Sequence, residues 1–432
     1  MILRTDVGRK SAAAALPGRR VHKSRWFRLA GRMAACWVVW ASCFQPVPLT
    51  YVGKTGTPFQ VRHWKSWSTT MLVREKKGSL SRKNGNVKAP GGGRSRASSS
   101  SPGGAKAAMI LTRRINKALT AAELLDVLSE AVVFPDFNEF HISAAYHTLA
   151  TFHQKKLLLP VCAESPVLPK LHARAEERIK SRQIDPRGSA NVLWAMAVLL
   201  EAIPSTTSLL PVLMNVFPEK APGMKAQELA NCVWASAQLK DVAPEVLQDV
   251  APDVLRVVPA LIAQIPSKAG EMIPQHLSNC LWASAHLKDV APDVLKVVQA
   301  LIAQTPSRAV DMKPQELSNS LWASAHLKDV APDVLKVVSA LAARLPSRAV
   351  DMKPQGLSNC LWASAHLKDV APDVLKVVPA LLAQIPGKAG QMTEINLSQC
   401  RWAVEELKDV APEVLKIEAA LMARRKAKAA SP

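Results

Sequence analysis

The sequence predicts an all-α protein, a right-handed α-solenoid of helical hairpins preceded by a disordered basic leader. Three observations support this prediction. The string LWASAHLKDVAPDVLKVV occurs three times without change, at 281–298, 321–338 and 361–378. Looser copies surround it, and a fixed period near 40 residues is typical of stacked helical repeats. No stretch within the repeats shows the alternating pattern of a β-strand.

Six tryptophans mark the repeats and define four segments. They are Trp194, Trp234, Trp282, Trp322, Trp362 and Trp402, with spacings of 40, 48, 40, 40 and 40 residues. The longer spacing contains an eight-residue tandem duplication, DVAPEVLQ followed by DVAPDVLR. We expect a leader and linker at 1–108, a helical cap with a divergent repeat at 109–183, an array of six hairpins at 184–424, and a basic tail at 425–432.

Most of the positive charge lies in the leader. Residues 1–108 contain 21 Lys and Arg but two acids, which leaves 35 basic and 32 acidic residues for the rest of the chain. The net charge of +22 is therefore no evidence that the array binds phosphate.

The leader has the composition of a targeting segment. A 12-residue apolar run at 33–44 is too short to cross a bilayer but matches the apolar region of a signal peptide. Followed by a basic Ser-rich tract, it resembles the two-part leaders of complex-plastid proteins. We expect a plastid location, with the mitochondrion as the alternative organelle, and no membrane span in the mature protein. A disordered basic tail with a chance apolar patch is the other interpretation.

In the cap, the spacing of apolar residues predicts a helix over 115–131, with Leu119 on its apolar face and Thr120 as an N-cap paired with Glu123. A second helix over 138–152 aligns with the first helix of the repeats and places His147 where later copies have tryptophan. Three prolines interrupt the pattern before a helix resumes at 175–182.

The repeat at 313–350 illustrates the predicted hairpin. Pro314 suits the first helical position, and Leu317, Leu321 and Ala325 form one apolar stripe. We expect the helix to end near residues 328–329. Pro332 should open a second helix, whose stripe is Val334, Val338, Leu341 and Leu345 and which should end at residues 346–347. Pro259 and Pro379 replace Ser or Gln of sister repeats, which predicts a solvent-facing position and a kink.

One face of each first helix is the candidate ligand-binding surface. Gln315, Asn319, Trp322 and His326 share that face, opposite the leucine stripe. The constant asparagines have two interpretations: bonds to the backbone of the neighbouring repeat, or contacts with a single-stranded nucleic acid. The tryptophans are expected to pack between repeats rather than stack on bases.

Positions that vary between repeats are better candidates for reading a sequence. One varying column contains Gly188, Glu228, His276, Glu316, Gly356 and Asn396, and another contains Gln238, His286, His326, His366 and Glu406. The full set of candidate RNA-binding residues is Glu228, Gln238, His276, His286, Glu316, His326, Gly356, His366, Asn231, Asn279, Asn319 and Asn359.

The sequence shows no constellation that would support catalysis or metal binding. Four cysteines, Cys232, Cys280, Cys360 and Cys400, share one repeat position with Val192 and Ser320, so a small packed residue is the simplest interpretation. No nucleophile–base pair, phosphate loop or paired carboxylates stand out. We expect no enzyme activity, no cofactor and no metal.

The motif LSNxLWASAHL, preceded by Pro-Gln and repeated near every 40 residues, resembles the octotricopeptide-repeat proteins. The segment NEFHISAAYHTLATF is similar to the first repeat of such proteins. The resemblance covers about residues 115–421. It implies an α-solenoid that binds single-stranded organelle RNA for translation, processing or stability of a transcript, with protein partners in a ribonucleoprotein. No C-terminal RAP-type domain is expected.

A scaffold of the HEAT or armadillo type, which grips a protein partner and binds no RNA, is the alternative function. The two differ in the expected role of the lysines that end each first helix, Lys288, Lys328, Lys368 and Lys408. Lysines that line one continuous face would favour RNA. Aspartates on the same face would cancel the field and favour the scaffold.

Overall fold

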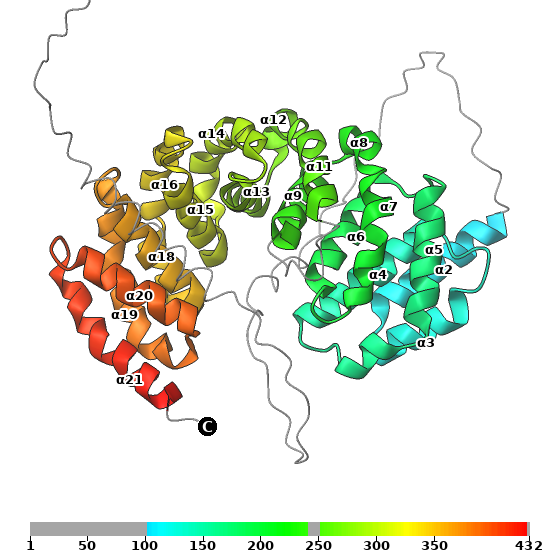
Figure 1. Ribbon diagram of the computed structural model, residues 1–432, viewed down its shortest axis with the longest axis horizontal. Coiled ribbons are helices and arrows are strands. Elements are labelled where there is room, and N and C mark those ends of the chain that lie inside the picture. Colours follow the sequence, from blue (N-terminus) through cyan, green and yellow to red (C-terminus); the bar gives the residue numbers. More distant parts are fainter. Residues whose placement is uncertain (1–101, 241–250, 430–432) are drawn as a thin grey trace, which may run out of the picture. The chain divides into compact units, whose positions relative to one another are not determined.

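The computed structural model describes residues 102–240 and 251–429. Within these ranges all regular secondary structure is helical, and the helices pack in series (Figure 1). The all-α prediction is therefore confirmed for the described part of the chain. Residues 1–101 of the predicted leader and linker (1–108) lie outside the described residues, as does most of the eight-residue duplication, at 241–250. Residues 102–108 belong to a helix, α2 (Pro102–Lys117).

Five helices form the cap: α2 (Pro102–Lys117), α3 (Ala121–Ala131), α4 (Glu139–Gln154), the 3₁₀ helix η1 (Pro160–Glu164) and α5 (Val167–Lys180). Thr120 is the N-cap of α3, as predicted, and its side chain accepts a bond from the Glu123 N–H. The single helix predicted for 115–131 is wrong, because the chain breaks at 118–120 to make this cap. Leu119 consequently lies in the break and is 81% exposed rather than on the apolar face.

Helix α5 also differs from the prediction. It begins at Val167, well before residue 175, with Pro166 as its N-cap residue and Pro169 inside its first turn. Proline is tolerated there because the first N–H groups of a helix have no intrahelical acceptor. Helix α4 follows the prediction for 138–152, and the Asn138 side chain caps it.

The first helices of the repeats form one row in which each contacts the next. They are α6 (Pro186–Leu199), α9 (Ala226–Lys240), α13 (Pro274–Leu287), α15 (Pro314–Leu327), α18 (Pro354–Leu367) and α20 (Glu394–Leu407), and α4 precedes α6 in the same row. Pro314 occupies the first turn of α15, and the helix ends at Leu327, as predicted. The stripe of Leu317, Leu321 and Ala325 is buried.

The second arms pack against the first helices and against the second arms of neighbouring repeats. From the cap onward they are η2 (Pro204–Leu209), α7 (Leu210–Met214), α8 (Phe217–Lys220) and η3 (Ala221–Gly223); α11 (Ala251–Ile262), α12 (Ile265–Lys268) and η4 (Ala269–Glu271); η5 (Pro292–Val297), α14 (Val298–Arg308) and η6 (Ala309–Asp311); η7 (Pro332–Val337), α16 (Val338–Ala342), α17 (Leu345–Arg348) and η8 (Ala349–Asp351); η9 (Pro372–Val377), α19 (Val378–Lys388) and η10 (Ala389–Gln391); η11 (Pro412–Ile417) and α21 (Glu418–Ala429).

The prediction of one continuous second helix is therefore wrong for the repeat at 313–350. Pro332 opens a 3₁₀ helix, in which the Val334 N–H donates to the Ala331 carbonyl at 2.9 Å. Helix α16 ends at Ala342, whereas α14 and α19 of the sister repeats continue as α-helix through Pro306 and Pro386, which stand where Pro346 does here. The arm then resumes as α17 and continues through residues 346–347, which were expected to end it. The predicted stripe of Val334, Val338, Leu341 and Leu345 is nevertheless fully buried.

The proline-exchange column is solvent-facing, as predicted. Pro259 and Pro379 are both exposed. Pro259 lies inside α11, but Pro379 lies in the first turn of α19, where it removes no helical hydrogen bond. The predicted kink therefore has no cause at Pro379.

Candidate ligand-binding face of the first helices

Along the first helices α13, α15 and α18, one face presents an amide, an asparagine, an indole and an imidazole in turn. In α15 these are Gln315, Asn319, Trp322 and His326, which lie about one helical turn apart. We call this surface the polar face. Gln315, Trp322 and His326 are partly exposed, whereas Asn319 is buried. The equivalent residues are Gln227, Asn231, Trp234 and Gln238; Gln275, Asn279, Trp282 and His286; and Gln355, Asn359, Trp362 and His366.

The aromatic residues of the polar face form a stack that crosses the repeats. The imidazole of His326 lies 3.9 Å from the ring centre of Trp322 in its own helix and 4.7 Å from that of Trp362 in the next. His286 and His366 repeat this arrangement between their neighbouring tryptophans. We call the alternating rings from Trp282 to Trp402 the Trp–His ladder.

The ladder places the tryptophans between repeats, as the sequence analysis expected. Ring centres of Trp322 lie 6.5 Å from Trp282 and 6.3 Å from Trp362, with a histidine ring close to both partners. Offset and tilted aromatic pairs of this kind stabilise a contact beyond the area they bury. Because neighbouring rings already contact one another, the ladder is a poor platform for stacking bases.

Burial keeps two histidines of the ladder, His326 and His366, neutral. It lowers the pKa of His326 to about 3, and the neighbouring His286 and His366 contribute in the same direction. Burial likewise lowers the pKa of His366 to about 4, with smaller contributions from Lys328 and Lys368. A neutral imidazole has one donor and one acceptor nitrogen, so these residues can take part in hydrogen bonds at neutral pH but add no positive charge.

The asparagine column is buried between successive first helices. Asn231, Asn279, Asn319 and Asn359 are 5–8% exposed. At the start of the array, the equivalent Asn191 donates to the Ser143 hydroxyl of the preceding helix at 3.0 Å. At its end, Gln399 accepts from Ser358 at 3.1 Å. The partner at these two junctions is a side-chain hydroxyl, not the backbone that the first interpretation expected.

At the α9–α13 junction the corresponding partner is missing. The amide nitrogen of Asn279 is buried and has no hydrogen-bond partner in the part of the chain that the structure describes. The residue equivalent to Ser143 and Ser358 is Ala230, which has no hydroxyl. The buried Nδ1 of His276, one turn earlier in α13, also has no partner there. This junction therefore contains two buried polar atoms that have no hydrogen-bond partner among the described residues.

The varying column that begins with Gly188 lies at the third residue of each first helix. Glu316 Oε2 accepts the Lys313 N–H at 2.8 Å, and Glu228 accepts the Lys225 N–H at the same distance. Asn396 accepts from the Thr393 N–H at 3.2 Å. These side chains are 6–9% exposed. They therefore satisfy the N-terminal N–H groups of their own helices, a role that the sequence analysis missed.

The remaining members of that column have no such role. Burial lowers the pKa of His276 to about 4, so its ring is neutral. Gly356 lies beside the preceding helix, and a Cβ at this position would be 3.4 Å from the Ser318 hydroxyl. Gln238, in the second varying column, is partly exposed.

Three of the lysines that end the first helices are paired with the next residue, whereas Lys408 pairs with Glu405. Lys288 lies 3.0 Å from Asp289, Lys328 lies 2.9 Å from Asp329, and the Lys368–Asp369 distance is 3.4 Å. The lysine side chains are about one-fifth exposed, whereas the three carboxylates are at least 74% exposed. Both charges thus share one edge, and the local field is largely cancelled.

The described cysteines are free and buried. Burial raises the pKa of Cys280 and of Cys400 to about 12, so both are unreactive thiols at neutral pH. Among the described residues, no cluster of His, Cys, Asp or Glu could hold a metal ion. None of the described helices is long and apolar enough to cross a membrane.

Comparison of the sequence with protein-family models and with curated proteins found no match.

Proposed function

We propose that the chain is an α-solenoid that binds single-stranded organelle RNA and supports the translation, processing or stability of a transcript. The observation that carries this proposal is the polar face. It presents partly exposed amides such as Gln275 and Gln355, and in the three repeats from α13 to α18 it also presents a partly exposed imidazole such as His326. Uncharged groups of this kind form hydrogen bonds with base edges.

The ladder limits how RNA would bind. Because the Trp and His rings pack on one another, bases would contact the edges of His286 or His326 and the amides beside them, rather than stack on Trp322. The amide column and the histidine column are about three helical turns apart on each first helix. Two columns could then contact one strand that runs across the helices.

The predicted leader fits this function, because a protein made in the cytosol must be imported before it can bind an organelle transcript. We propose a plastid destination, with the mitochondrion as the alternative. A fluorescent fusion that carries residues 1–108 would test it. Retention of the fusion in the cytosol would reject both organelles.

A protein scaffold is the second candidate, and the Lys–Asp pairs favour it. Affinity for nucleic acid normally depends on cations that displace counterions from phosphates, and Lys288 and Lys328 each face a neighbouring carboxylate. A near-neutral groove suits a polypeptide partner better than a bare phosphate backbone. Such a partner could also accompany RNA in a ribonucleoprotein.

Crosslinking and sequencing of RNA bound to the full-length protein in organelle extract would separate the two candidates. The variant pair Gln315→Ala with His326→Phe removes hydrogen-bonding groups and keeps an aromatic ring in the ladder. Lys336→Gln, on the exposed side of a second arm, is the matched control. Enrichment of one short site that only the polar-face variant weakens would support RNA binding. Equal RNA recovery from all three proteins, with a co-purifying protein lost from the polar-face variant, would support the scaffold.

A further inference from the structure

Helix α2 has two faces of different character, and one of them is packed. Ile115 is fully buried, and Leu111 lies against the core. The His141 ring of α4 is hydrogen-bonded through Nε2 to the Ala108 carbonyl at 2.9 Å, and its Nδ1 accepts the Asn138 N–H. Both ring nitrogens are thus used, and α2 is held on α4 through this inner face.

The outer face combines cations with large apolar side chains. At 100° per residue, Lys106, Met109, Ile110, Arg113 and Lys117 fall on the side opposite Ile115. All five are exposed, Met109 by 69% and Ile110 by 52%. Helix α2 contains no acidic residue.

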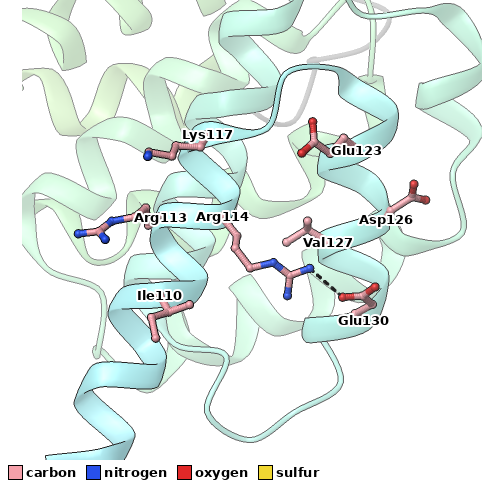
Figure 2. Close-up of a pocket in the computed structure, with 8 residues that line it drawn as sticks. All are labelled: Ile110, Arg113, Arg114, Lys117, Glu123, Asp126, Val127 and Glu130. Carbon is pink, nitrogen blue, oxygen red and sulfur yellow. Dashed lines mark hydrogen bonds and ion pairs between the residues drawn. The ribbon is translucent and has the colours of Figure 1, made fainter.

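Three carboxylates of α3 lie near this face, but within the described part of the chain none of them forms an ion pair with Arg113 or Lys117. In Figure 2, Arg113 and Lys117 project away from α3, whereas Arg114 points toward Glu130, with which it forms an ion pair of 3.0 Å. Glu123 accepts the Leu119 N–H at 2.7 Å. Ile110, Arg113 and Lys117 line one wall of a cavity of about 450 Å³ between α2 and α3, and Glu123, Asp126 and Glu130 of α3 line the other wall.

We propose that the outer face of α2 docks on the surface of an anionic lipid bilayer. The three cations would approach the headgroups, while Met109 and Ile110 would enter the boundary between headgroups and acyl chains. A helix of 16 residues is about 24 Å long and would lie in the plane of the surface. A nucleic acid would use the cations but would leave the two apolar side chains in water, so the lipid surface is the better match. This inference does not depend on RNA binding.

Lysine footprinting of the full-length protein tests the proposal locally, because the basic leader can also bind vesicles. The protein is acetylated with and without vesicles made of equal parts phosphatidylglycerol and phosphatidylcholine, and labelled lysines are measured by mass spectrometry. We expect the labelling of Lys106 and Lys117 to fall several-fold. Lys296 and Lys336, which are well exposed on second arms, should keep their reactivity.

A variant with Met109→Ser and Ile110→Ser should lose the protection of Lys106 and Lys117 while lysines in the leader keep theirs. The control, Val310→Ser with Val350→Ser, removes two exposed apolar side chains elsewhere and should behave as the parent protein. Unchanged labelling of Lys106 and Lys117 with vesicles would overturn the proposal. So would equal protection by pure phosphatidylcholine, protection by RNA alone, or low reactivity of both lysines before any vesicle is added.

Discussion

The hydroxyl of Ser339 donates a hydrogen bond of 2.7 Å to the carboxylate of Asp373, one repeat further along the chain. Gln299 contacts Asp333 in the same way, and the equivalent position is proline at 259 and 379. The bond joins two exposed side chains at the surface of consecutive second arms. Sister repeats with proline at this position pack in the same way without the bond. The bond is therefore not required for the packing of consecutive second arms.

Ser339→Pro should change the free energy of unfolding by no more than about 0.5 kcal/mol, as expected for an exposed substitution without other consequences. Residue 339 is the second residue of α16, matching the position of Pro379 in α19. Urea unfolding of the variant and of Ser339→Ala would measure the backbone and side-chain effects separately. A loss above about 2 kcal/mol for proline alone would contradict the equivalence of the two positions.

Removing one imidazole from the ladder should weaken two contacts at once. His326→Ala should destabilise the protein by about 1–3 kcal/mol, because aromatic pairs contribute about 0.5–1.5 kcal/mol each. His326→Phe should recover most of the loss, since it restores a ring between Trp322 and Trp362. Chemical denaturation would measure both effects. Equal losses for Ala and Phe would show that a hydrogen bond, and not stacking, is the important interaction.

The ladder should make the protein sensitive to mild acid. Folding lowers the pKa of His326 from 6.5 to about 3. As the pH falls below 6.5, this histidine therefore takes up a proton in the unfolded chain but stays neutral in the folded protein. Stability should therefore decrease from about pH 6.5 down to the folded pKa, by about 2 kcal/mol for this histidine near pH 5. Unfolding free energies measured between neutral pH and pH 5 would give the slope. His326→Phe should show a smaller slope, and an identical slope would argue against a neutral buried imidazole.

Ala230→Ser should stabilise the α9–α13 junction. The new hydroxyl would lie where Ser143 and Ser358 bond the residues equivalent to Asn279, and it could accept from the buried Asn279 amide, which has no partner among the described residues. We expect a gain of about 0.5–1.5 kcal/mol in the free energy of unfolding. The same change in an Asn279→Ala background should give little or no gain. If Ala230→Ser stabilised the Asn279→Ala protein by the full amount, the partner of the new hydroxyl would be a residue other than Asn279.

Local rules predicted the first helices well. The apolar stripe, Pro314 at the helix start, the end at Leu327 and the Thr120 cap all depend on residues within a few positions of one another. The second arm was predicted less well, because the spacing of its apolar residues fits one continuous helix and a 3₁₀ helix followed by two short α-helices equally well. The prediction for Leu119 was wrong because the helix begins at the Thr120 cap, although the apolar spacing continues to residues before it.

Contacts between repeats were harder to predict. The four-residue spacing of Trp322 and His326 indicates stacking within α15, but contact of His326 with Trp362 depends on how two helices cross. The capping role of Glu316 was not predicted, because the N-cap position is occupied by Lys313 and the usual capping-box pattern begins with Ser or Thr. The pattern at Thr393 and Asn396 was the one visible signal.

The ladder also has a consequence for the length of the protein. The stacking contact from a histidine to the next tryptophan is 4.9 Å at Trp322, 4.7 Å at Trp362 and 4.5 Å at Trp402, so successive interfaces are nearly interchangeable. Deleting 314–353 would bring His286 against Trp362 through residues identical to those it meets now. Recombination can therefore add or delete a whole repeat, because the new junction would be formed by the same contacts as the existing ones. Repeat number, rather than the shape of any single repeat, is the property most open to evolutionary change.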